Sequence, residues 1–104
     1  MDMDEMIQAC KDKQTDNEEI VFAVGAGRIA PMLGKMKQQK QAFKFIRSLD
    51  GFLGVHPIDM WHTMLIFDTL NNAKGGRNLM RTKDIPVGEI VPILIPKEYA
   101  RKKT

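Results

Sequence analysis

The sequence predicts a compact single-domain α/β sandwich with a small, mainly parallel sheet. Three short apolar segments, at 20–24, 61–67 and 90–95, are each typical of a buried strand. Helical patterns separate them, giving a β-α-β-α-β order with a short N-terminal helix in front. This alternation favours parallel pairing through right-handed crossovers. A ferredoxin-like variant is the alternative fold, and a fourth strand in 52–59 or a dimer across a sheet edge would enlarge the sheet.

Composition divides the chain into an acidic N-terminal arm at 1–18, an α/β core domain at 19–96 and a basic C-terminal tail at 97–104. Residues 1–20 have a net charge of −5, and the remaining 84 residues have a net charge of +8. The arm is expected either to screen the basic body or to pair with the body of a second subunit. A third interpretation, that both are simply solvated surfaces, stays open.

A short amphipathic helix is expected in the arm, because Met3, Ile7 and Cys10 lie at i, i+4 and i+7. The first strand follows at 20–24, a continuous apolar segment that is rich in β-branched residues and is followed by glycines. The next helix should begin close to Arg28 or Ile29, because Pro31 fits only within its first turn. The buried face of that helix is expected to contain Ile29, Met32, Leu33 and Met36.

The central strand is expected at 61–67, where both faces are largely apolar. Either Asp68 or Thr69 can cap the following helix. Gly75 and Gly76 each cost that helix about 1 kcal/mol relative to alanine, and we expect close packing against the sheet to offset this cost. The sheet-facing side of the helix is expected to contain Leu70, Ala73, Arg77 and Met80.

The last strand is expected at 90–95 and contains Pro92. Proline has no N–H to donate to a strand ladder, and a central strand needs those donors on both sides. This strand is therefore expected to lie at a sheet edge or to contain a bulge.

A phosphate-loop candidate lies at 24–30, where the sequence VGAGRIA fits the pattern G-x-G-x-x-A between a predicted strand and a predicted helix. Glycines in such a turn let the backbone approach a phosphate, and the helix N-terminus supplies free N–H groups. Gly25, Gly27 and Arg28 are the candidate residues. Ordinary turn glycines would give the same pattern, and the candidate ribose-binding acid, Asp68, follows about twice as late as the motif requires.

A run of basic residues points to an anionic partner. Residues 28–47 contain six bases and no acid, whereas a solvated helix face usually mixes both signs. The last four bases advance by 3, 4 and 3 residues, so they share one stripe of a helix. Such a stripe can replace the counterions condensed on a nucleic acid. The candidate anion-binding residues are Arg28, Lys35, Lys37, Lys40, Lys44 and Arg47.

Residues suited to catalysis or metal binding form no specific set. His56, His62 and Cys10 have no metal-ligand spacing. We expect His62 to be a buried core residue and His56 to be exposed in a loop. Asp59, His62 and Asp68 could approach one another around the central strand, but that trio is generic. The sequence therefore predicts a protein that is not an enzyme and uses no metal or cofactor.

The predicted function is non-catalytic binding of an anionic partner, with nucleic acid as the leading candidate. The alternatives are a protein that binds a nucleotide or phosphate ligand at the glycine turn, and a small adaptor or inhibitor that docks on an acidic protein surface. A homodimer is compatible with each. The single cysteine and the absence of a signal peptide or a run of about 20 apolar residues predict a cytoplasmic protein without a membrane partner.

Overall fold

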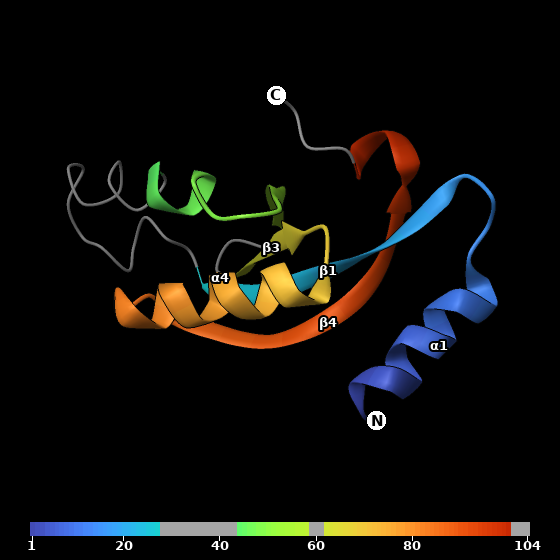
Figure 1. The fold of residues 1–104 in the computed structure, drawn as a ribbon, viewed down its shortest axis with the longest axis horizontal. Coiled ribbons are helices and arrows are strands. Elements are labelled where there is room, and N and C mark those ends of the chain that lie inside the picture. Colours follow the sequence, from blue (N-terminus) through green and yellow to red (C-terminus); the bar gives the residue numbers. More distant parts are fainter. Residues whose placement is uncertain (28–43, 59–61, 101–104) are drawn as a thin grey trace.

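A computed structural model of the chain describes residues 1–27, 44–58 and 62–100. Figure 1 shows a sheet with one long helix packed across it and a second helix at its far end. None of the described helices is long and apolar enough to span a membrane. The helices are α1 (Met3–Lys13), α4 (Leu70–Thr82) and the 3-10 helix η1 (Lys97–Tyr99). The strands are β1 (Glu18–Gly27), β2 (Phe52–Pro57), β3 (His62–Phe67) and β4 (Val87–Pro96).

The sheet is antiparallel throughout, with the order β2-β3-β1-β4. The predicted mainly parallel sheet is therefore wrong, because β2 and β3 pair as a hairpin that returns β3 between β1 and β2. β1 and β2 run in the same direction, but β3 lies between them. β3 and β4 also run in the same direction, and β1 lies between them. This order and pairing agree with the ferredoxin-like alternative, and β2 lies within 52–59, where a fourth strand was one of two ways to enlarge the sheet.

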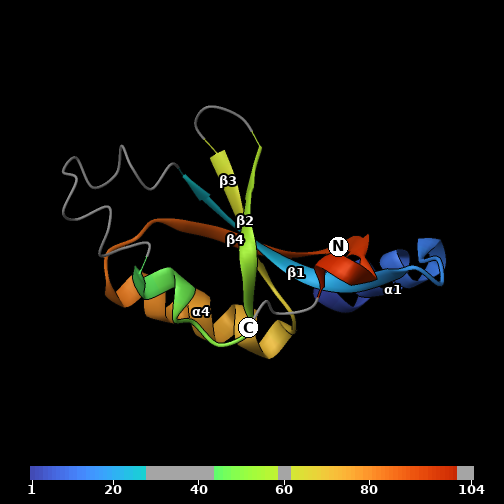
Figure 2. The same cartoon turned by 90° about the horizontal axis from the view of Figure 1, so that it is seen from above.

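The main core lies between the sheet and α4, which covers one face of the sheet (Figure 2). Alternate residues of each strand point to this face, as the two-residue period of a strand requires. Burial of each large side chain here contributes about 1.5–3 kcal/mol. The core side chains come from β1 (Phe22, Val24, Ala26), β3 (Leu65, Phe67), β4 (Ile90), α4 (Ala73, Met80) and the connections (Ile46, Leu49, Ile85).

The sequence of α4 explains its limits and its orientation. The Thr69 side chain accepts a hydrogen bond from the backbone N–H of Asn72 at 3.1 Å, so Thr69 is the N-cap. Ala73 and Met80 are fully buried against the sheet, which confirms the predicted sheet-facing side. The predicted helix at 28–43, with its apolar face, lies outside the described residues.

The expected N-terminal helix is confirmed as α1, and it packs against β4 and β1. Met3 and Ile7 lie against the same core that α4 covers. On the same helix, the Cys10 thiol donates to the backbone carbonyl of Pro92 on β4, with 3.6 Å between sulfur and oxygen. α1 therefore docks on the edge strand through both apolar contacts and this thiol.

The expectation for Pro92 is confirmed, because β4 is an edge strand of the sheet. The β1–β4 pairing also contains a register shift between Val24 and Ala26 on β1. Such an irregularity bends the strand locally and increases its twist. The presence of Pro92 in a strand predicted either an edge position or a bulge. The β1–β4 pair has both features.

The opposite face of the sheet is also apolar. Of the described helices only η1 borders this face, where the following Ala100 packs against it. Val21 and Ala23 in the central strand are fully buried by their neighbours on this face. The surrounding side chains are only half-buried: Leu53, Met64, Val91, Ile93 and Ile95. We call this surface the open face.

Candidate functional site

The strongest basic feature of the described fold lies on α4. From residue 69 to residue 83 the chain has four bases and no acid. Because Ala73 and Met80 take the sheet-facing side, Lys74 and Arg81 are exposed on the outer side of the helix. Burial of one face thus turns the bases of the other face toward solvent.

A helical turn at 44–47 extends this basic surface. Its residue Ile46 is buried in the α4-side core, so the exposed Lys44 and Arg47 lie on the helical side of the sheet (Figure 2). Lys83, which follows α4, places its Nζ 5.7 Å from the ring centroid of Phe45. This cation–π contact, worth about 0.5–1 kcal/mol at an exposed site, links the turn to the end of the helix. We call the six bases the basic layer: Lys44, Arg47, Lys74, Arg77, Arg81 and Lys83.

Arg77 has a special position in the basic layer because it is half-buried. Its Nε atom is buried and has no hydrogen-bond partner in the described part of the chain. A buried donor that lacks an acceptor costs about 1–3 kcal/mol. The half-buried Arg77 thus adds a positive charge to the basic layer from a position that is partly inside the fold.

Acidic residues flank the basic layer rather than interrupt it. Asp68 precedes α4 and already accepts a hydrogen bond from the Asn72 side-chain amide, with 2.8 Å between the two atoms. Asp84 follows the helix at a positive φ of 57°. The charged side chains between these two acids are therefore all basic, and the exposed surface there also contains amide and hydroxyl side chains and Leu79.

Two of the six bases predicted to bind anions, Lys44 and Arg47, are described by the structure, and both are exposed. The other four, namely Arg28, Lys35, Lys37 and Lys40, lie outside the described residues. The bases of α4 were missed as candidates, although their signal was present as a second acid-free run at 69–83. The structure brings both described runs to one side of the sheet.

The phosphate-loop candidate has a different local structure from the one expected. Gly25 and Gly27 are extended residues of β1, paired with Met64 and His62 of β3, rather than members of a strand-to-helix turn. A shallow cavity of about 520 Å³ next to Gly25 has no lysine or arginine among the described residues that line it. Arg28 lies outside the described residues, and phosphate binding at this segment stays a prediction.

The histidines do not form a catalytic or metal-binding group with the described acids. His56 is exposed, as expected, but it lies in β2 rather than in a loop. His62 is also exposed, because it begins β3 at the end of the sheet. Asp68 follows the other end of β3, about 20 Å from His62 at about 3.3 Å per residue, and Asp59 lies outside the described residues. Within 1–27, 44–58 and 62–100, no three His, Cys, Asp or Glu side chains gather into a group that could hold a metal ion.

Comparisons of the chain with models of protein families, with curated proteins and with solved structures find no match. The chemistry of the sites themselves therefore indicates the function. Guanidinium and ammonium groups fixed on a packed helix, with no acid among them, favour partners that present several negative charges.

Proposed function

We propose that this protein is a non-catalytic module that binds an anionic polymer, with nucleic acid as the leading candidate, through the basic layer. The observation that supports the proposal is the acid-free outer surface of α4, next to which Lys44 and Arg47 are also exposed. Ammonium and guanidinium groups at such a surface bind phosphates by releasing condensed counterions. This module would belong to the cytoplasm, where the single free Cys10 stays reduced.

The outer stripe of α4 favours a nucleic acid over a simple anion. Asn71, Lys74, Asn78 and Arg81 are all exposed and follow one another at intervals of 3, 4 and 3 residues. Lysine and arginine contact phosphates, whereas asparagine can also form hydrogen bonds with sugars and base edges. A helix with this composition can lie along a polyanion and contact several of its units.

The open face is the less suitable surface for a nucleic acid. Sheets that bind single strands usually stack bases on aromatic side chains beside a basic groove. Here the strand residues that pack on the open face are aliphatic, among them Leu53, Ile66 and Ile93. The basic layer lies on the other side of the sheet, so we assign the polyanion to the helical side.

The proposal is tested by fluorescence anisotropy with labelled single- and double-stranded oligonucleotides at low and at physiological salt. The double variant Lys74→Ala/Arg81→Ala should weaken binding about tenfold, which corresponds to about 1.4 kcal/mol. The matched control Lys11→Ala/Lys13→Ala removes the same charge from the exposed side of α1 and should bind almost as the parent does. Equal losses in both variants would mean that net charge, and not the basic layer, determines binding.

The alternatives give different results in parallel experiments. A nucleotide ligand at the glycine segment would raise the melting temperature, and Gly27→Val would remove that shift. An acidic protein surface would be favoured if no oligonucleotide binds even at low salt while an acidic protein is still retained on the immobilised parent.

A further inference from the structure

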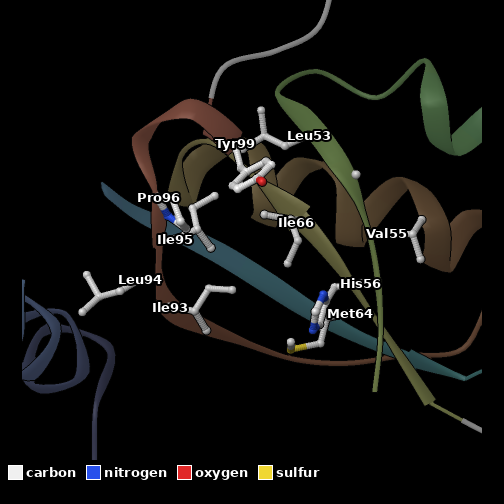
Figure 3. A pocket seen from close by; sticks show the side chains of 11 residues that line it. Leu53, Val55, His56, Met64, Ile66, Ile93, Leu94, Ile95, Pro96 and Tyr99 are labelled. Atoms are coloured by element: carbon white, nitrogen blue, oxygen red, sulfur yellow. The ribbon is translucent and has the colours of Figure 1, made fainter. Parts of the chain in front are cut away.

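A pocket of about 560 Å³ lies on the open face, away from the basic layer. It is bordered by β2, β3, the end of β4 and η1 (Figure 3). Its volume falls within the range of about 300–1,000 Å³ that is typical of small-molecule sites. Side chains from three strands converge on it, so the pocket is built on the sheet rather than on a loop.

The lining of the pocket is almost entirely aliphatic. Leu53, Ile66 and Ile93 point into it, together with Met64 and Ile95 (Figure 3). None of the described residues that line it is a lysine, arginine, aspartate or glutamate. An ionised group would lose its hydration here without gaining a counter-charge. The lining therefore selects against the charged partners that the basic layer favours.

Two polar side chains at the rim complete the site. Tyr99 extends from η1 over the pocket and is 64% exposed, and the His56 ring lies at the opposite side (Figure 3). A tyrosine hydroxyl can donate or accept a hydrogen bond, as can a histidine ring. They are placed to orient one polar group of a ligand whose body lies on the aliphatic floor.

Gly54 leaves space on the floor of the pocket. It pairs with Ile66 of β3, so a side chain at this position would point to the open face. A Cβ atom built at Gly54 meets no atom within 4 Å. Glycine weakens a strand interior, so the absence of a side chain here costs stability and leaves the volume free.

We infer that this pocket binds a small, uncharged, mainly apolar molecule with one hydrogen-bonding group. The concave wall formed by Tyr99 above the strands favours a small ligand over a second copy of the chain, for which a flat sheet face would be sufficient. This site is separate from the proposed polyanion surface and does not depend on it.

The test uses N-phenyl-1-naphthylamine, a neutral probe whose fluorescence rises in apolar surroundings. Saturable binding is expected for the parent, with displacement by 1-decanol and weaker displacement by decanoate. Gly54→Phe fills the floor and should weaken probe binding at least about tenfold, the loss expected when a ligand no longer fits its pocket. Tyr99→Ala, at an exposed position outside the core, should also weaken it.

Gly75→Phe is the matched control. It is the same substitution at an exposed position of α4, away from the pocket, where a built Cβ atom meets nothing within 4 Å. Its probe affinity should stay close to that of the parent, and so should that of Lys74→Ala/Arg81→Ala. Urea unfolding of each variant verifies that the fold is retained.

Two results would overturn the inference. The first is equal probe binding by the parent, Gly54→Phe and Tyr99→Ala. The second is sedimentation that shows a parent dimer which Gly54→Phe dissociates, because the pocket would then be an interface between copies.

Discussion

Gly76 of α4 lies directly against the aromatic ring of Phe67 on β3. A Cβ atom at Gly76 would lie 2.7 Å from both Cε1 and Cζ of that ring. Phe67 is fully buried and makes an edge-to-face contact with Phe52, with 5.7 Å between the ring centroids. The helix therefore approaches the sheet most closely where it has no side chain. Gly75, one residue earlier, is exposed, and a Cβ there would meet nothing within 4 Å.

The two adjacent glycines should respond to alanine in opposite directions. Gly75→Ala should stabilise the protein by up to about 1 kcal/mol, because alanine is the better helix former. Gly76→Ala gains the same propensity but crowds the Phe67 ring, and overpacking of this kind typically costs about 1–3 kcal/mol. Urea unfolding of both variants measures the difference, and a stabilised Gly76→Ala would contradict the close approach.

The cap of α4 should contribute measurably to stability. Thr69→Ala removes the acceptor for the Asn72 N–H and should cost about 1 kcal/mol in unfolding free energy. Thr69→Ser keeps a hydroxyl at the same position and should restore most of the loss. The midpoint of chemical denaturation distinguishes the two variants, and equal destabilisation by serine would show that the hydroxyl is not the important group.

Docking of α1 should control the reactivity of Cys10. Ile7→Ala removes part of the contact between α1 and the core, so the thiol next to Pro92 should become accessible more often. Alkylation by iodoacetamide under native conditions should then be faster than in the parent. Gln8→Ala alters the exposed side of the same helix and serves as the control. If both variants react at the parent rate, the contacts of Ile7 do not hold the helix in place.

The salt dependence of the nucleic-acid affinity should report the number of phosphate contacts that α4 makes. Each contact contributes about 0.9 to the slope of log K against log salt for a duplex and about 0.7 for a single strand. Removing Lys74 and Arg81 should thus reduce the slope by about 1.8 or about 1.4, respectively. Lys74→Arg keeps the charge and should leave the slope unchanged. Titrations at four salt concentrations provide the measurement.

Strong local patterns made several elements predictable from the sequence. The apolar segment of β3, the helical periodicity of α4 and the N-terminal helix agree with the structure. Pro92 indicated an edge strand or a bulge because proline has no N–H to donate to a neighbouring strand, whatever the tertiary contacts are. In each of these cases the necessary information lies within a few residues.

The direction of the strands depended on one element that the pattern did not reveal. The β2 sequence FLGVHP contains a glycine and ends in proline, and its pairing shifts register between Phe52 and Gly54. A strand of this kind has no clear two-residue alternation. Without the hairpin that it forms with β3, the remaining elements indicated parallel neighbours. One unassigned strand therefore changed the predicted pairing of the whole sheet.

Tertiary contacts also determine the local structure of the candidate sites and the side of the sheet on which they lie. Gly25 and Gly27 fit a turn as well as a strand, because glycine has little preference between the two, and pairing with β3 decides for the strand. The outward direction of Lys74 and Arg81 follows from helical period alone. That Lys44 and Arg47 lie on the same side of the sheet depends on the packing of Ile46, which the sequence does not specify.

The contact between Cys10 and Pro92 also bears on how the chain behaves in crowded solution. An unprotected outer strand is a template to which strands of other molecules can add, one after another, until fibres form. Pro92 offers no N–H to an incoming strand, and its carbonyl already accepts the thiol of a docked helix. The covering helix therefore protects the β4 edge against strand addition, and detachment of α1 would expose that edge.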